Sequence, residues 1–380
     1  MKGLPLEGLI VLEFSQYLSG PSAGLRLADL GARVIKIERP NGGDAGRRLP
    51  IKNLWADDSS LLFHTINRNK ESFTADLKNA EDLAGIKKLI GKADVMLHNF
   101  RPGVMEKTGL DYAAVAALNP RIVYAALSGY GKEGPWKNKP GQDLLLQSMT
   151  GLAFTSGNGD NGPVPFGIAI GDILSGAQLV QGILAALIRR QKTGKGALIE
   201  LSLMESLIDF QFELFTTYFA SGVTPQRSQV NNGHPLLSAP YGIYKTNDGY
   251  IALAMMDIHA LGKAIECLPL GEVNPVSVFS KRDEIKSILA AHLANNSSAY
   301  WMEKLHACDL WAMEVLNWEA MTEHEAYQAL AMEQSFTAGG KDIITTRCPI
   351  RIDGRRIYSG KPAPKLGEHT TSIKKELAGI

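Results

Sequence analysis

Asp172 is the carboxylate whose surroundings most favour chemistry. It follows an apolar run, has Gly171 before it and Gly176 after it, and stands at the start of a long apolar segment. A purely structural role is an N-cap or first-turn aspartate, which contributes about 1 kcal/mol to a helix. The glycines allow a second interpretation, because backbone without Cβ lets a ligand approach the carboxylate closely. A carboxylate held against a reactive acyl group can act as a covalent nucleophile.

Three glycine-rich motifs are alternative candidates for a site. Residues 20–24 match GxSxG, the nucleophile motif of serine hydrolases, and we keep a serine hydrolase using Ser22 as an alternative function. In those enzymes the Ser stands at the immediate strand-to-helix turn, whereas here a five-residue loop follows the first expected strand. We therefore expect Ser22 near the cap of a helix. Residues 129–134 and 157–162 match GxGxxG, but neither segment opens a helix, so both are predicted to be turns.

Single basic residues recur at or near the ends of the expected strands. A solvated surface is the ordinary explanation of such residues. Together they could also bind a phosphorylated ligand, with Arg making forked contacts and Lys supplying point charges. The set comprises Arg39, Lys78, Arg101, Lys107, Lys137 and Lys139.

The first part of the chain alternates strand-like and helix-like segments. Short apolar runs predict strands at 9–14, 33–37, 94–97 and 122–127, and helical spacing predicts helices at 22–30, 81–90 and 112–118. This alternation predicts a parallel sheet with helices on both faces, and ligands of such sheets bind beyond the carboxyl ends of the strands. A long apolar helix is expected at 173–192, with a turn and a strand at 193–203.

A different pattern begins beyond residue 222. A β-hairpin is predicted at 241–254, turning at Asn247-Asp248-Gly249, and amphipathic helices near 258–267, 282–294 and 298–307. A chain of 380 residues suggests about two domains. We expect an α/β protein with a large domain at 1–222 and 330–380, built from both chain ends, and a small α+β domain at 225–325.

Composition argues against several classes of function. Lys and Arg together number 40 against 39 Asp and Glu, so the net charge of +1 gives no general attraction to nucleic acid or to an anionic membrane. No window of 18 uncharged apolar residues predicts a membrane span. The eight histidines are scattered and predict no metal site. Cys267, Cys308 and Cys348 lie far apart, so we expect reduced core thiols in a cytoplasmic protein.

Several segments, taken in order, are similar to one known family. The chain resembles the class III CoA-transferase family (the CaiB/BaiF family), which includes formyl-CoA transferase. The resemblance covers nearly all 380 residues. It is carried by LEGLIVLEFSQYLSGP, LGARVIKIERPNGGDAGR, NRNKESFTADLK, ADVMLHNFRPGVMEKTGLDY, NPRIVYAALSGYGKEGPWKNKPGQD, IAIGDILSGAQ, RRQKTGKGALIELSLMESL and APKLGEH.

The resemblance implies an enzyme that uses acyl-CoA as co-substrate. It implies a Rossmann-like large domain, a smaller domain and an interlocked homodimer. By position, Asp172 matches the catalytic aspartate of the family. That aspartate attacks a donor thioester to give a mixed anhydride, becomes an aspartyl-CoA thioester, and passes CoA to a small carboxylic acid, plausibly a dicarboxylate. No metal, nicotinamide or flavin is implied.

The resemblance also implies which positions bind CoA. Arg39, Lys78, Arg101 and Lys107 would hold its phosphates, and Asn99 with nearby backbone would position the nucleotide or pantetheine arm. The full set of matching positions is Leu18, Ser19, Arg39, Ala75, Asp76, Leu77, Lys78, Asn99, Phe100, Arg101, Lys107, Lys139, Gln142 and Asp143.

Departures from the family pattern narrow the expected activity. Leu18 stands where formyl-CoA transferase has Gln, and residues 230–240, which include His234, lack its tetraglycine loop. Oxalate or formate specificity is therefore not inferred. Racemases of the same family pair the aspartate with the His of a GHD segment, because epimerisation needs two acid/base groups. Gln142 replaces that His here, which disfavours a 2-methylacyl-CoA racemase. A non-catalytic acyl-CoA-binding subunit is a further alternative.

Overall fold

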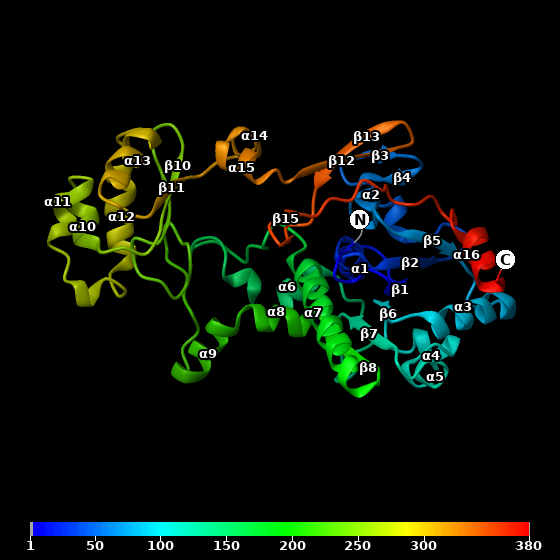
Figure 1. Ribbon diagram of the computed structural model, residues 1–380. Helices are drawn as coiled ribbons and strands as arrows, with labels where there is room; N and C mark the ends of the chain where they lie inside the picture. The colour runs from blue at the N-terminus through cyan, green and yellow to red at the C-terminus, as the bar shows by residue number, and fades with distance from the viewer. Residues whose placement is uncertain (1–2, 380) are drawn as a thin grey trace. The chain divides into compact units, whose positions relative to one another are not determined.

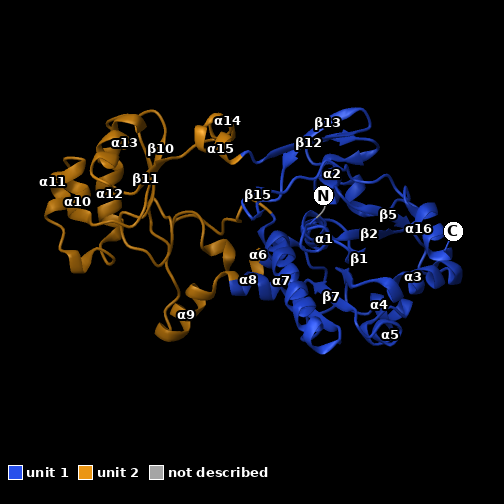
Figure 2. Ribbon diagram, viewed as in Figure 1, with its two compact units in different colours: residues 1–146, 169–209, 331–380 blue, residues 147–168, 210–330 orange. Residues whose placement is uncertain are grey.

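Residues 3–379 are described by the structure, a computed structural model that divides into two compact units (Figure 2). Unit 1 comprises Met1–Leu146, Ala169–Asp209 and Ala331–Ile380, and unit 2 comprises Gln147–Ile168 and Phe210–Leu330. The segments 147–168 and 210–222, which we expected in the large domain, group with unit 2.

Local pairing explains why these two segments group together. The Gln147 side chain accepts a hydrogen bond from Phe166 N and donates one to Ile168 O, at 2.8 and 3.1 Å. The Gln211 amide donates to Thr150 O at 3.2 Å, and the ring of Phe166 meets that of Phe210 edge-on. The contacts join 147–168 to the residues that begin the second part of unit 2.

Unit 1 holds the elements that the alternating pattern predicted, with several additions (Figure 1). The chain leaves this unit within α6, returns just before α7, leaves again at the end of α8 and returns at Ala331. Its elements are β1 (Ile10–Phe14), α1 (Ser19–Asp29), β2 (Arg33–Glu38), η1 (Ala45–Arg48), β3 (Trp55–Ala56), β4 (Ser59–Ser60), α2 (Leu61–Asn67), β5 (Glu71–Thr74), α3 (Ala80–Lys92), β6 (Val95–His98), α4 (Val104–Thr108), α5 (Tyr112–Leu118), β7 (Val123–Ser128), α6 (Asp143–Met149), α7 (Ile170–Thr193), β8 (Ala197–Ser202), α8 (Leu203–Phe210), β12 (Glu333–Ala338), β13 (Lys341–Thr346), β14 (Arg351–Ile352), β15 (Arg355–Arg356) and α16 (Thr370–Ala378).

A parallel sheet forms the centre of unit 1. Among the described residues it has six strands in the order β5-β2-β1-β6-β7-β8, and every neighbouring pair is parallel. The order runs outward in one direction from β1 to β5 and in the other from β6 to β8. Such a reversal is the switch point of a doubly wound fold, and it lies between β1 and β6, whose carboxyl ends flank the crevice that ligands use in these folds. The predicted mixed α/β class is confirmed.

The two faces of the sheet differ in chemistry because successive side chains of a strand point to opposite faces. Leu12 and Phe14 of β1 and Ile35 of β2 belong to an apolar core with residues of α3, α5 and α16. Glu13 and Lys36 alternate with them, so they point to the other face, and both are fully buried there. Buried charge on that face of the strands sets up the ion cluster described below.

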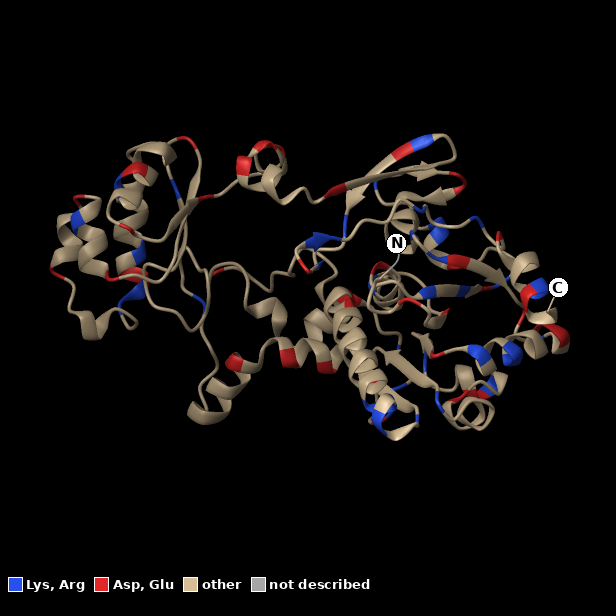
Figure 3. Ribbon diagram, in the orientation of Figure 1, with Lys and Arg blue, Asp and Glu red and all other residues tan. Residues whose placement is uncertain are grey.

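The helix α7 packs along α1 and against β7 and β8. It is long and apolar enough to cross a membrane by length and composition alone, a test that the core helices of soluble proteins also pass. Basic residues gather at its C-terminal end (Figure 3), where they complement the helix dipole. One of them, Arg190, is buried and also pairs with Asp94 at 2.9 Å.

Unit 2 carries the expected hairpin and helices around its own apolar core. Tyr244, Ile251 and Trp301 are buried in that core, and the sheet order is β11-β10-β9. Cys308 is exposed, so the expectation that all three cysteines are core thiols is wrong for that residue, which follows the end of a surface helix. The elements are η2 (Leu152–Phe154), α9 (Phe212–Ser221), β9 (Gly242–Lys245), β10 (Tyr250–Leu253), α10 (Ile258–Ala264), α11 (Leu268–Gly271), η3 (Pro275–Ser277), α12 (Arg282–Leu293), α13 (Ser298–Ala307), β11 (Ala312–Glu314), α14 (Trp318–Glu323) and α15 (Glu325–Leu330).

Candidate active site

Asp172 lies in the first turn of α7, but it does not cap that helix. The N-cap residue is Ala169, whose side chain makes no capping hydrogen bond. Asp143 takes the role instead, because its Oδ1 accepts hydrogen bonds from Gly171 N at 2.7 Å and Asp172 N at 3.2 Å. The backbone N–H groups of the first turn need such acceptors. Asp172 therefore has a side chain that helix capping does not use.

The glycines beside Asp172 serve packing rather than ligand access, which corrects the sequence-based interpretation. A Cβ on Gly171 would lie 2.9 Å from Asp143 Oδ1, inside the cap. A Cβ on Gly176 would lie 2.2 Å from Ser22 Oγ and 2.8 Å from Ser19 O. Real Cβ atoms do not come so close to backbone oxygen, so Gly176 is what lets α1 approach the first turns of α7.

The surroundings of Asp172 resist its ionisation. Burial is the largest effect, the carboxylate of Asp143 adds to it, and together they raise the pKa of Asp172 to about 6. A hydrogen bond from the Ser19 side chain acts in the opposite direction. At neutral pH the carboxylate is still mostly ionised, and it is poorly solvated. These are the properties of an activated carboxylate nucleophile.

This raised pKa gives a prediction about stability. The ordinary value is 3.8, so between pH 4 and 6 folded Asp172 holds a proton that the unfolded chain has lost. Ionised Asp172 therefore costs stability above pH 6, on the order of 3 kcal/mol. We expect Asp172→Asn to be more stable than the wild type at pH 8 and to lose this advantage at pH 4. Urea unfolding at both pH values measures the difference; an equal gain at both would contradict the prediction.

Asn99 fixes the loop between β1 and α1. Its Oδ1 accepts a hydrogen bond from Gln16 N at 2.9 Å, and its Nδ2 donates to Gln16 O at 2.8 Å and to Ser19 Oγ at 3.3 Å. Leu18 is the N-cap residue of α1, and Ser19 is its buried first residue. The end of β6 thus holds the end of β1 at the switch point of the sheet, next to Asp172.

A small cavity of about 30 Å³ opens at the carboxyl ends of β1, β2 and β5. Four of the predicted CoA-binding residues line it together, namely Arg39, Ala75, Leu77 and Phe100. The Arg39 guanidinium donates to Gly43 O at 3.3 Å, and its side chain is exposed to solvent. The structure therefore brings a basic group and apolar side chains to one edge of the sheet, as an anion-bearing ligand with an apolar arm requires.

The alternative motifs behave as turns or helix. Ser22 lies inside the first turns of α1, which begins at Ser19 and not near Ser22 as expected. Pro21 is tolerated there because the first helical residues have no N–H partner to lose. The Ser22 hydroxyl donates to Ser19 O at 2.8 Å, so Ser22 does not stand at a strand-to-helix elbow. The segments 129–134 and 157–162 are turns and bends, as predicted.

Known proteins resemble this chain over almost its whole length. The model of CoA-transferase family III matches residues 6–370. The chain belongs to CoA-transferase family III. It is 31% identical to acetyl-CoA:oxalate CoA-transferase of Acetobacter aceti, over 98% of this chain and 96% of that one. It is also 31% identical to succinate–glutarate CoA-transferase of Agrobacterium fabrum, over 99% of this chain and 96% of that one.

A solved structure supports the membership of this chain in family III. A CaiB/BaiF family protein from Brucella suis superposes with a TM-score of 0.86 at 31% identity, covering 99% of this chain and all of that one. The resemblance expected from the motifs is confirmed, and family III enzymes use CoA thioesters as co-substrates.

The remaining predicted CoA positions do not line the small cavity. Asp76 Oδ1 accepts a hydrogen bond from Lys78 N at 3.0 Å in an exposed turn. Arg101 lines a second, larger cavity of about 550 Å³ with His98 and Tyr124, on the side of α4 and α5. Three further residues are exposed and line neither of these two cavities as the structure describes them: Lys107, Lys139 and Gln142.

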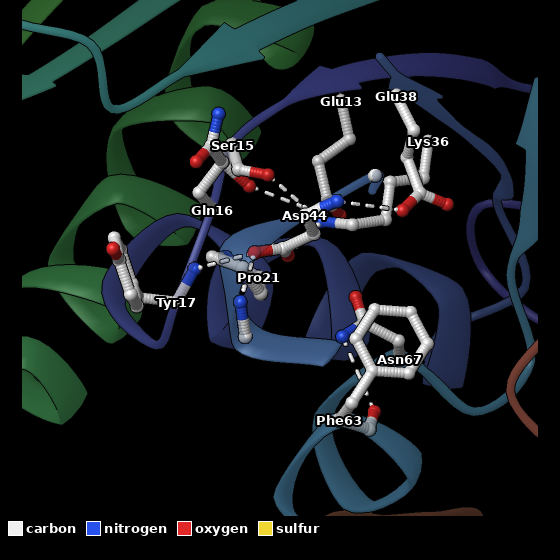
Figure 4. Close-up of polar contacts among 12 residues, drawn as sticks. Glu13, Ser15, Gln16, Tyr17, Pro21, Lys36, Glu38, Asp44, Phe63 and Asn67 are labelled. Atoms are coloured by element: carbon white, nitrogen blue, oxygen red, sulfur yellow. Dashed lines mark hydrogen bonds and ion pairs between the residues drawn. The ribbon is translucent and has the colours of Figure 1, made fainter. Parts of the chain in front are cut away.

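A buried ion cluster lies beside the small cavity, which Asp44 of the cluster also lines. Figure 4 shows polar contacts of Glu13, Lys36 and Asp44. Lys36 Nζ lies 2.8 Å from Glu13 Oε1 and 2.9 Å from Asp44 Oδ2, and Lys70 Nζ lies 2.7 Å from Glu13 Oε2. Burial opposes the charge on Lys36, but Asp44 and Glu13 outweigh it and raise its pKa. Asp44 Oδ1 also accepts a hydrogen bond from Tyr17 N at 3.1 Å. The cluster therefore ties β1 and β2 to the loop that precedes Ser19.

This cluster was not expected from the sequence, although the strands carry a signal for it. Glu13 and Lys36 are single charged residues within otherwise apolar strands, IVLEF and RVIKIE. A charged residue inside a buried strand needs an opposite charge nearby. In the structure β1 and β2 are parallel neighbours and place Glu13 directly opposite Lys36, a register that the two strand ranges alone do not fix.

Proposed function

We propose that this family III chain moves CoA from an acyl-CoA donor to a small carboxylic acid through covalent intermediates on Asp172. One observation carries the proposal: Asp172 is a half-buried carboxylate, left free by the Asp143 cap, with a pKa raised to about 6 by burial and by Asp143. A carboxylate that is poorly solvated but still ionised at neutral pH is a good nucleophile towards a thioester.

The reaction proceeds in four balanced steps. An Asp172 oxygen attacks the thioester carbonyl and the carbon–sulfur bond breaks. CoA departs as the thiolate, and Asp172 and the donor acyl group form a mixed anhydride. The thiolate then attacks the Asp172 carbonyl carbon, releasing the donor acid and forming an aspartyl-CoA thioester. The acceptor carboxylate attacks that thioester and expels the thiolate again, which gives a second anhydride. Attack of the thiolate on the acceptor acyl carbon releases the new acyl-CoA and restores Asp172.

Small dicarboxylic acids are the candidate acceptors. The names of the relatives include oxalate, succinate and glutarate, and the first two relatives cover almost the whole chain. The residues proposed to hold the phosphates of CoA are the basic ones at the carboxyl edge of the sheet, Arg39, Lys78, Arg101 and Lys107. The shape of the pocket decides between acids that differ in length. Each methylene group changes the free energy of transition-state binding by about 1–3 kcal/mol.

A homodimer, interlocked as in the family, is part of the proposal. Its support is the apolar side chains that single chains leave exposed. In unit 2, Phe212 and Phe219 of α9 are 67% and 75% exposed. In unit 1, Ile188 of α7 is 64% exposed. Exposed apolar surface of this kind is typical of protein interfaces.

The test is direct detection of the intermediate. Wild-type protein is incubated with acetyl-CoA or with succinyl-CoA and no acceptor, then digested and weighed by mass spectrometry. We expect a mass increase on the peptide that contains Asp172, and conversion of Asp172 to a hydroxamate when hydroxylamine is present. CoA without an acyl group is the control and should leave the peptide unmodified. An adduct on any other residue, or none with either donor, would contradict the mechanism.

A further inference from the structure

The Asn99 side chain has one possible orientation. Its Oδ1 must face the N–H of Gln16 and its Nδ2 the carbonyl of Gln16, at 2.9 and 2.8 Å. Turned over, the amide would place a donor against a donor and an acceptor against an acceptor. The second hydrogen of Nδ2 is therefore directed to Ser19 Oγ, at 3.3 Å. Asn99 is a donor, and not an acceptor, towards Ser19.

The direction of this bond decides what the Ser19 hydroxyl can do. Ser19 is 5% exposed. Because its oxygen already accepts a hydrogen bond from Asn99, its own O–H is available to donate to another acceptor. Asp172 is the acceptor within reach, because it lies one turn of α7 before Gly176, where a Cβ would lie 2.8 Å from Ser19 O. The lowering effect of Ser19 on the pKa of Asp172 agrees with this placement.

Helix packing brings Ser19 and Asp172 together. Asp172 and Gly176 are four residues apart, so they lie on the same face of α7. Gly176 meets the first turn of α1, where a Cβ would lie 2.8 Å from Ser19 O. The first turns of the two helices therefore abut where the hydroxyl and the carboxylate meet.

We propose that Asn99 is a positioning residue that acts through Ser19, holding its hydroxyl so that the proton is donated to the Asp172 carboxylate, which stays ionised and oriented for attack. The inference rests on the proposed function, in which Asp172 attacks a thioester. It also changes the roles expected for Ser19 and Asn99. The side chains of Ser19 and Asn99 act on Asp172. Any contribution of these two residues to CoA binding then comes from their backbone atoms.

Two neighbours act on Asp172 in opposite directions. Asp143, from the start of α6, is the titratable group that acts on it, and the charge of Asp143 disfavours ionisation of a second carboxylate. Ser19, from α1, is the side-chain donor and favours the ionised form. Without the Ser19 hydroxyl, Asp172 keeps only burial and Asp143, so its pKa must rise further. Without Asn99 the hydroxyl is free to rotate away, and the same change follows in part.

An infrared titration measures this charge without requiring turnover. The carboxyl band of Asp172 is taken as the difference between each protein and the same protein carrying Asp172→Asn. We expect the midpoint to rise by about one pH unit in Ser19→Ala and by less in Asn99→Ala. The double variant should titrate like Ser19→Ala, because a residue that acts through Ser19 has no effect once the hydroxyl is gone. Ser22→Ala, a hydroxyl of the same helix that bonds to backbone, is the matched control and should not shift the midpoint.

Calorimetric binding of CoA separates this role from a direct contact. Ser19→Ala and Asn99→Ala should bind CoA within about two-fold of wild type. A large loss of CoA affinity with an unshifted midpoint would overturn the inference. Ser19→Cys, which keeps a weaker donor of similar size, should give an intermediate midpoint and guards against a folding defect in the Ala variant.

The outcomes also distinguish this inference from the proposed function. If wild type forms the covalent adduct but Ser19→Ala titrates as wild type does, the positioning role is wrong and the nucleophile stands. If Ser19→Ala shifts the midpoint but wild type forms no adduct, the proposed function is wrong, although Ser19 sets the charge on Asp172. If wild type forms the adduct and Ser19→Ala also shifts the midpoint, the pH dependence of the rate of adduct formation should shift as well. The pH at which this rate falls off on the acidic side should rise together with the midpoint.

Discussion

Replacing Asp172 by Ala is expected to lower CoA transfer by about four orders of magnitude or more, while binding of CoA remains. Loss of a covalent nucleophile removes both anhydrides and the aspartyl thioester, and no neighbouring group repeats its position. Asp143 is a neighbouring carboxylate that acts on Asp172, but its Oδ1 is committed to the backbone of Gly171 and Asp172. The measurement is the initial rate of transfer from succinyl-CoA to a dicarboxylic acid, with CoA binding followed by calorimetry.

A pair of further variants completes this test. Asp172→Asn keeps the size of the side chain but has no carboxylate oxygen to attack, so it should be as inactive as Asp172→Ala and form no adduct. Asp160→Ala removes an exposed aspartate of unit 2 and should transfer CoA at the wild-type rate. Wild-type turnover by Asp172→Ala would remove the covalent mechanism.

The second large effect is expected on stability, from Lys36→Met. Lys36 is fully buried between Glu13 and Asp44. Removing its charge leaves the buried carboxylate of Asp44 without this cation, whereas Glu13 keeps its pairing with Lys70. Breaking a buried ion pair on one side costs about 3 to 5 kcal/mol, because the abandoned charge stays desolvated. Urea or guanidinium unfolding followed by circular dichroism measures the loss.

The control for this prediction is a lysine of the same type in a different place. Lys87 is exposed on α3, and Lys87→Met should change the free energy of unfolding by less than about 0.5 kcal/mol. A comparably small effect of Lys36→Met would contradict the prediction. It would mean that the desolvation penalty of the buried charges is as large as the attraction within their ion pairs.

Much of unit 1 could be predicted because its strands are continuous apolar runs. The strands expected at 33–37 and 122–127 are β2 and β7 within one residue at each end, and the helix expected at 112–118 is α5. The strand β5 was missed, since ESFT contains one large apolar residue, Phe73. It forms because β2 pairs with one side of it and residues of the tail bond to Ser72 and Thr74.

The site was predictable in part, for a related reason. Asp172 could be placed at the start of a helix because the apolar segment after it is local in sequence. The Asp143 cap joins residues 28 and 29 positions apart, and the Asn99 contacts join residues 80 and 83 positions apart. Such pairings depend on which strand ends become neighbours in the sheet, so periodicity within any one segment does not reveal them.

The return of the tail to β5 has a consequence for synthesis of the protein. Gly367 N donates to Ser72 Oγ at 2.9 Å, Thr370 Oγ1 accepts from Thr74 N at 2.9 Å, and Ile373 of α16 is buried in the core that contains Phe73. The ribosome makes these residues after all of unit 2, whose last segment ends at Leu330. The edge of the sheet at β5 therefore stays uncovered while unit 2 is being synthesised, and unit 2 can fold before unit 1 is able to close.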